Sequence, residues 1–251
     1  MHRLLVAPEA LEQSSVVLPK DAAHHLKVLR PKTGEEIELF DGCGATRVYR
    51  YAGSCLEAAA ARRQFPRSQM ALTLFACVTK GSRWDWTIEK AVELGVARIV
   101  PVISERCIVR LSASEREGKA ERWRRVAEDA ARQSDAVWLP EVLPAVDFTQ
   151  GLDLVRACDR VFVGALTNPP PPPLLTAVLK DLETFPRVAA CPSGSLGLFV
   201  GPEGDFSPVE LASLLEIAEP TSFGPTILRA ETAAIYGLSV LAAAVCGFSG
   251  K

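Results

Sequence analysis

The sequence lacks the residue patterns that mark several common classes of protein. Its seven cysteines are widely spaced and form no Cys-x-x-Cys pair, which argues against a zinc site or a disulfide framework. The three histidines, His2, His24 and His25, all lie near the N-terminus, so we expect no histidine-centred triad and no metal site. No G-x-x-x-x-G-K-[ST] loop and no G-x-S-x-G turn occurs, which argues against P-loop nucleotide binding and a hydrolase nucleophile.

Long apolar runs are also missing. No run approaches the roughly 18–20 residues that span a bilayer. The N-terminal stretch MHRLLVAPEALEQ carries acids early and lacks the apolar core of a signal peptide. With 48% hydrophobic and 23% charged residues, the composition is that of a globular protein. We therefore expect a cytoplasmic protein with no membrane partner.

A strong net charge is absent as well, because the formal value is only −2. The distribution is uneven: residues 98–125 carry 8 Lys and Arg against 4 Asp and Glu, and residues 1–69 carry 10 against 8. Local basic patches attract a phosphate backbone whatever the total charge is. From charge alone, a solvated helix face is still the favoured interpretation.

The first part of the chain has the pattern of a small β domain. Residues 35–40 alternate charged and apolar side chains, as a half-buried strand does. Asp41-Gly42 predicts a turn into a second strand over residues 45–53. Residues 21–31 predict a short helix, and residues 61–69 are typical of a linker.

A different pattern begins at Met70. Residues 71–78 and 98–104 are apolar runs, as in strands buried on both faces. Between them, residues 82–94 show helical periodicity that ends at Gly95. A strand, a helix and a strand within about thirty residues predict a βαβ unit and a parallel sheet.

The rest of the chain continues this alternation. Ser114 and Glu117 predict the capping box of a long helix. Five consecutive prolines predict an extended connection, for which a PxxP ligand role is the less favoured alternative. Further elements are expected as strands over 160–166 and 219–223 and as helices over 174–182 and 230–245. The expected fold class is α/β, with a β domain over residues 1–68 and a parallel α/β domain over residues 69–251.

Two glycine loops in the second domain have the pattern of a binding site. Gly201-Pro202-Glu203-Gly204 follows an apolar run, and Ser207, Pro208 and Glu210 predict a capped helix directly behind it. Residues 222–233 repeat the pattern of strand, Gly-Pro, apolar residues and helix. Ligands in open α/β sheets bind beyond the carboxyl ends of strands, and glycine lets them approach the backbone. For either loop alone, a tight turn that binds nothing is the alternative.

Four stretches of the sequence together resemble the RsmE family of 16S rRNA uridine-N3 methyltransferases, within the SPOUT superfamily. They are HHLKVLRPKTGEEIELFDG, VTKGSRWDWTIEKAVELGVARIVPVISERC, LFVGPEGDFSPVEL and FGPTILRAETA, in the expected order over nearly the whole chain. The resemblance implies a PUA-like RNA-binding β-barrel over residues 1–68 and a SPOUT methyltransferase domain with a deep trefoil knot over residues 69–251. It also implies a homodimer, S-adenosyl-L-methionine as methyl donor, and N3 of a uridine in the decoding region of the small ribosomal subunit as acceptor.

The resemblance also assigns site residues. The donor-binding residues would be Leu166, Thr167, Val200, Gly201, Pro202, Glu203, Gly204, Phe223, Gly224, Ile227, Leu228, Arg229 and Thr232. Uridine N3 is a poor nucleophile until its proton leaves. We expect Arg229 to stabilise the developing charge, and Glu231 or Glu203 to position the base or remove the proton. RNA contacts are expected from Lys27, Arg30, Arg47, Arg50, Lys80 and Arg83.

The chain departs from the family pattern at three places. Asp205 stands where a second glycine is usual, Thr226 where an arginine is usual, and Ala136 at the arginine of a Glu-Gln-x-Gly-Arg stretch. These positions concern RNA contact or the dimer more than donor binding. Two other functions stay open: a knotted enzyme that methylates the ribose 2′-OH of RNA, and a non-catalytic RNA-binding protein that needs no donor.

Overall fold

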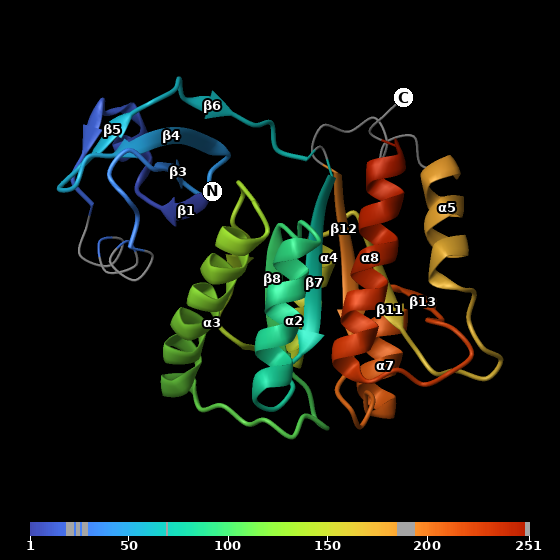
Figure 1. Ribbon diagram of the computed structural model, residues 1–251. Helices are drawn as coiled ribbons and strands as arrows, with labels where there is room; N and C mark the ends of the chain where they lie inside the picture. The colour runs from blue at the N-terminus through green and yellow to red at the C-terminus, as the bar shows by residue number, and fades with distance from the viewer. Residues whose placement is uncertain (19–22, 24–25, 27–29, 69, 185–193, 249–251) are drawn as a thin grey trace. The chain divides into compact units, whose positions relative to one another are not determined.

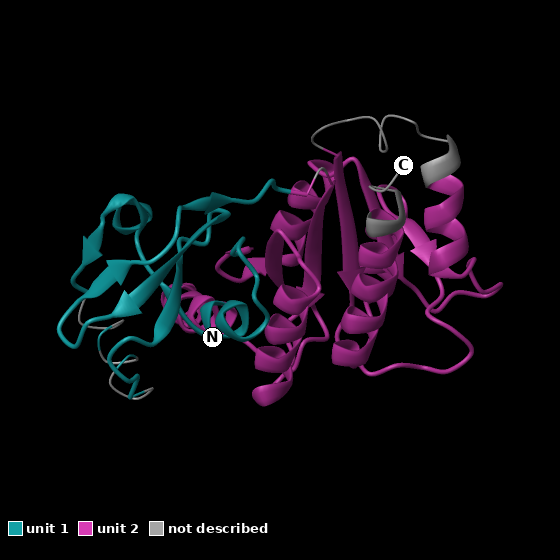
Figure 2. Ribbon diagram, turned by 45° about the horizontal axis from the view of Figure 1, so that its top comes forward, with its two compact units in different colours: residues 1–67, 128–139 teal, residues 68–127, 140–251 magenta. Residues whose placement is uncertain are grey.

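The computed structural model describes residues 1–18, 23, 26, 30–68, 70–184 and 194–248. The chain is a mixed α/β protein that divides into two compact units, each built around one sheet of the described strands. The N-terminal unit contains residues 1–67 together with 128–139, and the second unit contains residues 68–127 and 140–251 (Figure 2). No pattern in the sequence marks residues 128–139 as part of the N-terminal unit.

The sheet of the N-terminal unit forms where the alternating pattern predicts strands. Its order is β1 (His2–Leu5), β3 (Glu36–Phe40), β4 (Ala45–Tyr51), β5 (Leu56–Ala58) and β2 (Ser15–Val16), with β6 (Arg63–Gln64) paired to β4. A 3-10 helix, η1 (Pro8–Glu12), packs on β3 and β4. Alternate side chains such as Ile37, Leu39 and Tyr49 are fully buried in the core of this unit. Of the helix predicted over residues 21–31, Ala23 and Leu26 are described as helical and Arg30 and Pro31 as non-helical, and the other positions lie outside the described residues.

Residues 128–139 join the N-terminal unit through a buried arginine. Arg3, only 7% exposed, donates from Nη1 to the carbonyls of Ala131 at 2.8 Å and Ala136 at 3.3 Å. Its Nε pairs with Glu38 at 2.7 Å. The Gly44 amide donates to the carbonyl of Val137 at 2.9 Å. A buried guanidinium needs several acceptors, and the end of the long helix supplies them.

The second unit is a parallel sheet with helices on both faces (Figure 1). The strand order is β10 (Val146–Asp147), β8 (Arg98–Ile103), β7 (Met70–Cys77), β12 (Gly194–Val200), β11 (Arg160–Gly164) and β13 (Glu219–Thr221), with β9 (Glu141–Val142) paired to β8. The expectation of a parallel sheet is confirmed, because every pair in this sheet is parallel. The first apolar runs correspond to β7 and β8.

Helices cover the two faces of this sheet as the apolar stripes require. Side chains of α4 (Phe148–Arg156) and α7 (Pro208–Leu215) share one core cluster with Phe75 and Phe199. On the other face, α8 (Ala230–Phe248) packs on β7 and β12 and contacts both α2 (Ser82–Glu93) and α5 (Leu174–Thr184). Gly95, with φ of +75°, follows α2 as predicted. None of the described helices is both long and apolar enough to cross a bilayer.

The start of the long helix differs from the prediction. Helix α3 (Ala113–Gln133) begins before Ser114, and Ser112 is the residue directly before it. The Ser112 amide donates to the Glu115 carboxylate at 2.9 Å, and its hydroxyl donates to the same oxygen at 2.6 Å. The sequence contains two overlapping Ser-x-x-Glu pairs, and the pattern alone does not distinguish them.

Candidate functional site

A pocket of about 130 Å³ lies at the carboxyl ends of three adjacent strands of the second unit. Because β11 is paired on one side with β12 and on the other with β13, the loops that follow these strands meet. This is the edge of a parallel sheet where ligands bind. The pocket is lined by Gly164, Ala165, Leu166, Val200, Gly201, Pro202, Glu203, Asp205, Thr221, Ser222, Phe223, Gly224, Thr226, Ile227, Leu228, Ala230 and Ala233.

The loop of residues 201–204, here called the donor loop, connects β12 to a capped helix. The predicted capping box is confirmed: the Ser207 side chain accepts from the Glu210 amide at 3.4 Å, and the Glu210 carboxylate accepts from the Ser207 amide at 3.0 Å. A Cβ at Gly201 would lie 3.0 Å from the Phe206 ring. The absence of a side chain therefore lets the loop pack tightly and presents its backbone to the pocket.

Asp205 lies in this wall with an unusual backbone conformation. Its φ is +59°, in the left-handed region that glycine adopts most easily. Its carboxylate accepts a hydrogen bond from the Phe206 amide at 2.8 Å. Aspartate is one of the few side chains that tolerate this region, since it can hydrogen-bond locally. Glycine, which is usual at this position in the family that the sequence resembles, adopts this left-handed conformation without strain.

The loop after β11 supplies the opposite wall. A Cβ at Gly164 would come within 2.5 Å of the Phe223 ring, so only glycine allows the two loops to approach this closely. The Ala165 amide donates to the Thr221 carbonyl at 3.1 Å, which fixes the spacing. Leu166 is 63% exposed and Ile227 is 81% exposed. These two apolar side chains at the pocket suit a ligand with an apolar face.

Two acids and one arginine meet beside the pocket. Arg83 Nη1 lies 3.5 Å from Glu203 Oε1, and Arg83 Nε lies 3.8 Å from Glu231 Oε1. Glu231 is only 8% exposed, and its Oε2 has no hydrogen-bond partner among the described residues. The structure therefore brings together the two predicted catalytic acids. The predicted catalytic Arg229 is exposed and does not line the pocket.

The predicted donor residues divide between the wall and its surroundings. Those in the wall are Leu166, Val200, Gly201, Pro202, Glu203, Phe223, Gly224, Ile227 and Leu228; those outside it are Thr167, Gly204, Arg229 and Thr232. The wall also contains residues that we did not predict, namely Gly164, Ala165, Asp205, Thr221, Ser222, Thr226, Ala230 and Ala233. Most of these residues lie at the end of a strand or the start of a helix, next to a residue that we predicted. That neighbourhood in the sequence could have identified them.

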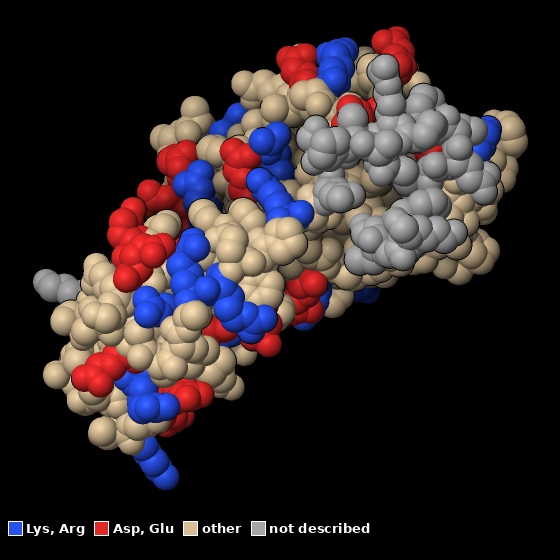
Figure 3. Space-filling model, turned by 90° about the horizontal axis from the view of Figure 1, so that it is seen from above, with Lys and Arg blue, Asp and Glu red and all other residues tan. Residues whose placement is uncertain are grey.

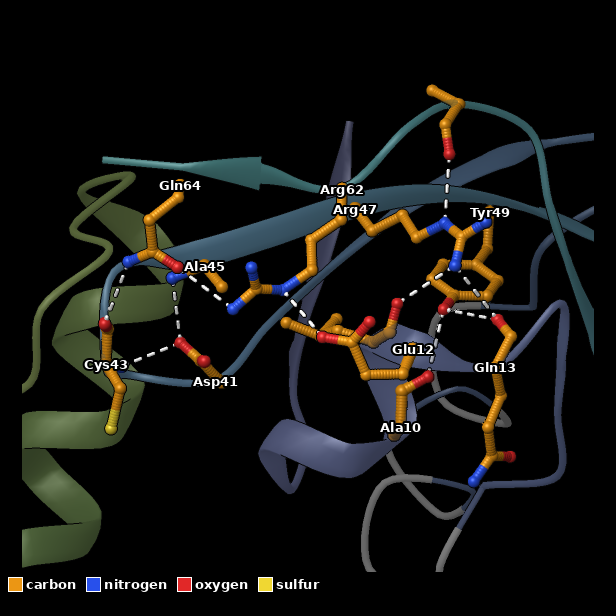
Figure 4. A network of polar contacts seen from close by, with 12 residues as sticks. Ala10, Glu12, Gln13, Asp41, Cys43, Ala45, Arg47, Tyr49, Arg62 and Gln64 are labelled. Carbon is orange, nitrogen blue, oxygen red and sulfur yellow. Dashed lines mark hydrogen bonds and ion pairs between the residues drawn. The ribbon is translucent and has the colours of Figure 1, made fainter.

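The predicted RNA contacts in the N-terminal unit have different surroundings. Arg47 donates to the backbone carbonyls of Ala60 at 2.9 Å, Leu11 at 2.9 Å and Gln13 at 3.2 Å (Figure 4). Arg50 forms an exposed pair with Glu36 at 3.3 Å. Arg30 is exposed, and Lys27 lies outside the described residues. The guanidinium of Arg47 therefore stabilises the N-terminal unit through hydrogen bonds to its backbone.

Two arginines that we did not predict stack on aromatic rings in the same unit. Arg63 lies 4.8 Å from the centroid of Phe65, and Arg67 lies 5.4 Å from that of Trp138. Both arginines are exposed. Figure 3 shows one face of the molecule, on which basic side chains gather in a cluster. For Arg63, the nearby Phe65 was the available sequence signal, but residues 61–69 were interpreted as a linker. Trp138 lies far from Arg67 in the sequence, so no local pattern marked that pair.

The described residues contain no group of three or more His, Cys, Asp or Glu side chains that could hold a metal ion. The charged side chains that meet beside the pocket are those of Arg83, Glu203 and Glu231. In the same region, burial raises the pKa of the Cys77 thiol, which packs beside Ser104. We assign this thiol a packing role.

Comparison with known proteins shows what this chain is similar to. A family model described as an RNA methyltransferase domain matches residues 66–242. Ribosomal RNA small subunit methyltransferase E of Bacillus subtilis is 30% identical over 88% of this chain and 87% of that protein. The Mycobacterium tuberculosis protein of the same name is 32% identical over 90% of this chain and 85% of that protein. The crystal structure of a ribosomal RNA small subunit methyltransferase E from Neisseria gonorrhoeae bound to S-adenosyl methionine matches with a TM-score of 0.78 and 29% identity, covering 96% of each chain.

Proposed function

Because the chain belongs to the ribosomal RNA small subunit methyltransferase E (RsmE) family, we propose that it methylates N3 of a uridine in the decoding region of 16S rRNA. The enzyme is an S-adenosyl-L-methionine-dependent methyltransferase of small-subunit ribosomal RNA. The choice of N3 and of a decoding-region uridine is the part that we propose. It is motivated by the four stretches that resemble uridine-N3 methyltransferases.

The proposal is supported mainly by the residues that line the donor pocket. Its wall consists mostly of glycine, proline and apolar residues that present backbone groups. Among the described lining residues, the charged side chains are those of Glu203 and Asp205, both acidic. This wall suits an adenine, which backbone groups can recognise, and the positive charges of a sulfonium and an ammonium. It would not suit a polyphosphate, which needs cationic or N–H-rich surroundings.

We assign the donor to residues of the three loops that meet in the pocket. Leu166 and Ile227 offer exposed apolar surface, and the close approach of Gly164 to Phe223 sets the width between two of the loops. Gly201, Pro202, Glu203, Gly224 and Leu228 complete the site, with Thr167, Gly204, Arg229 and Thr232 as outer residues that a bound donor could still reach. When bound, the donor supplies an electrophilic methyl group.

The acids beside the pocket suit the acceptor chemistry. In the reaction, the bond from sulfur to the methyl carbon breaks, a bond from N3 to that carbon forms, and the N3 proton must leave. Glu231 has a buried carboxylate oxygen with no hydrogen-bond partner in the described part of the chain, and this oxygen can accept the proton or orient the N3–H group. Arg83 lies close enough to both acids to limit their mutual repulsion. Arg229 is the candidate for stabilising negative charge on the uracil oxygens.

The domain assignments are also proposals. Residues 1–68 would be a PUA-like RNA-binding β-barrel, supported by the six-stranded sheet of the N-terminal unit. Residues 69–251 would be a SPOUT domain with a trefoil knot. The strand order supports this assignment, because β12 lies between β7 and β11 in the sheet although it follows both strands in the chain. An experimental structure with an unknotted path of the chain would contradict this assignment.

We place RNA on exposed cations. Arg30 and Arg50 in the N-terminal unit and Lys80 and Arg83 in the second unit were expected from the sequence, together with Lys27 and Arg47, and the stacked Arg63 and Arg67 add to those of the N-terminal unit. Binding that rests on phosphate contacts should weaken steeply as the salt concentration rises. An RNA affinity that does not change with salt would argue against this surface. The expected cytoplasmic location follows from a ribosomal substrate.

The decisive test of the function is mass spectrometry of nucleosides from 16S rRNA. RNA from cells that lack the protein should lack one N3-methyluridine, and wild-type protein with S-adenosyl-L-methionine should restore it. Persistence of N3-methyluridine would refute the proposal, and appearance of a 2′-O-methylated nucleoside would support the rival chemistry. Loss of turnover in Glu231→Ala and Arg229→Ala tests the assigned roles, which unchanged turnover in both would refute.

A further inference from the structure

We propose that a second cavity of the methyltransferase unit, the basic groove, binds the phosphate backbone of the acceptor RNA strand next to the donor pocket. This inference rests on the proposed function, because it concerns the same acceptor. The groove has a volume of about 430 Å³ and lies at the carboxyl ends of β7 and β8. Its basic side chains are Lys80, Arg110, Lys119 and Arg122.

The fold brings these four cations together from three segments. Lys80 follows β7 and Arg110 follows β8, and since the two strands are parallel neighbours, the chain leaves both at the same edge of the sheet. Lys119 and Arg122 are three residues apart on α3, which places them on one side of the helix. Of these four, only Lys80 was expected to contact RNA.

The positive charge of the groove is only partly neutralised. Arg122 pairs with Asp85, and Arg110 donates to the backbone carbonyls of Ser104 and Glu105. Lys80 and Lys119 are exposed, and no ion pair among the described residues involves either of them. The one acid of the lining, Glu115, accepts hydrogen bonds from Ser112. Two exposed ammonium groups in a concave surface, of which that of Lys119 also interacts electrostatically with Glu115, attract a phosphate backbone.

The start of α2 adds to this field. Gly81 lines the groove and is the N-cap of α2, and no side chain caps this helix. A Cβ on Gly81 would meet no atom within 4 Å, so the backbone here is open to the groove. Uncapped amides at a helix N-terminus carry partial positive charge. The N-terminus of α2 therefore adds positive potential to the groove that the lysines line.

The groove adjoins the donor pocket through shared residues. Thr79 and Trp84 line the groove, and both also line a small void together with Val200, Ala230 and Glu231. Val200 and Ala230 belong to the wall of the donor pocket. An RNA strand held in the groove would therefore lie close to Glu231 and to the methyl donor. The exposed Ile108, 68% accessible, offers apolar surface to a base at the rim.

The experiment compares charge reversals on one helix. Lys119→Glu reverses a groove charge, whereas Arg125→Glu makes the same change at an exposed residue of α3 that does not line the groove. Methyl transfer is measured on small ribosomal subunits from cells that lack the enzyme, over a series of salt concentrations. Donor affinity is measured separately by calorimetry. Two further variants are measured in the same way: Lys119→Ala, which removes the charge, and Lys119→Arg, which keeps it.

We expect Lys119→Glu to raise the KM for the subunit about tenfold relative to Arg125→Glu, with donor affinity unchanged. The slope of log KM against log salt should fall by about one, and Lys119→Arg should restore both values. Equal effects of Lys119→Glu and Arg125→Glu, or an effect on kcat alone, would overturn the proposal. A failure of the proposed function would look different, because the wild-type product would not be N3-methyluridine.

Discussion

The guanidinium of Arg83 lies 3.5 Å from the carboxylate of Glu203, and this ion pair joins helix α2 to the donor loop. Arg83 also lies 3.8 Å from Glu231 at the start of α8. One side chain therefore connects three segments that surround the site. The sequence predicted Arg83 as an RNA contact, and the geometry adds a role in positioning the two acids.

Replacing Arg83 should affect the site more than the fold. Arg83→Ala removes the cation between Glu203 and Glu231, so we expect donor affinity or kcat to fall about tenfold, equivalent to about 1.4 kcal/mol. Because Arg83 is half exposed, global stability should change by less than about 1 kcal/mol. Calorimetry with the donor and thermal unfolding measure the two effects. Arg98→Ala, which breaks an exposed pair with Glu141 outside the pocket lining, is the matched control. Identical behaviour of both variants would count against this role.

Gly164 controls the width of the donor pocket. In Gly164→Ala the new methyl group would lie 2.5 Å from the Phe223 ring, so the ring or the loop must move. We expect a loss of stability of about 1–3 kcal/mol and weaker donor binding. Gly118→Ala in α3 is the control, since its Cβ meets no atom within 4 Å, and it should stabilise the protein by about 0.5–1 kcal/mol. Unchanged donor affinity in Gly164→Ala would be the contrary result.

The backbone at Asp205 makes a prediction about side-chain choice. With φ at +59°, Asp205→Gly should be tolerated within about 1 kcal/mol, because glycine adopts this region without strain. Asp205→Val should be less stable than the glycine variant by about 1–2 kcal/mol, because a β-branched residue is strained there. Denaturant titration of both variants checks the order. A valine variant as stable as the glycine variant would refute the argument.

Arg47 and Arg50, both expected to bind RNA, should respond differently to replacement. Arg47→Ala removes three hydrogen bonds to backbone carbonyls, of which that of Gln13 keeps a second donor in the Tyr49 hydroxyl, so we expect a loss of about 2 kcal/mol in the N-terminal unit. Arg50→Ala removes only an exposed pair and should change stability by less than about 0.5 kcal/mol. Hydrogen exchange of the amides near η1 reports on this unit directly. Equal protection in the two variants would contradict the distinction.

The expected homodimer predicts a role for exposed aromatic residues. Trp86 on α2 is 43% exposed and Tyr236 on the contacting α8 is 39% exposed. If this face pairs with a second copy, Trp86→Glu should give a monomer by light scattering. Val209→Glu makes a similar change on α7, which covers the opposite face of the sheet, and should leave the mass unchanged. A monomeric wild-type protein would refute the dimer itself.

Sequence patterns predicted those features that depend on residues a few positions apart. The apolar runs over residues 71–78 and 98–104 predicted β7 and β8, and the Ser207–Glu210 box predicted the start of α7. Where two local patterns overlap, as at Ser112 and Ser114, the prediction failed by two residues. Strands of only two residues, such as β9 and β10, carry no periodicity that could reveal them.

The sequence by itself determined the type and order of the main elements and the motifs that resemble a methyltransferase family. The reason is that helix caps, periodicity and glycine turns are local, and each can be read from neighbouring residues. Only the tertiary structure decided which distant groups meet: the side chains of Arg83 and Glu203, 120 positions apart, and the Arg3 side chain with the Ala131 carbonyl, 128 positions apart. Those contacts depend on how the strands of each unit order themselves, and strand order results from packing over the whole unit.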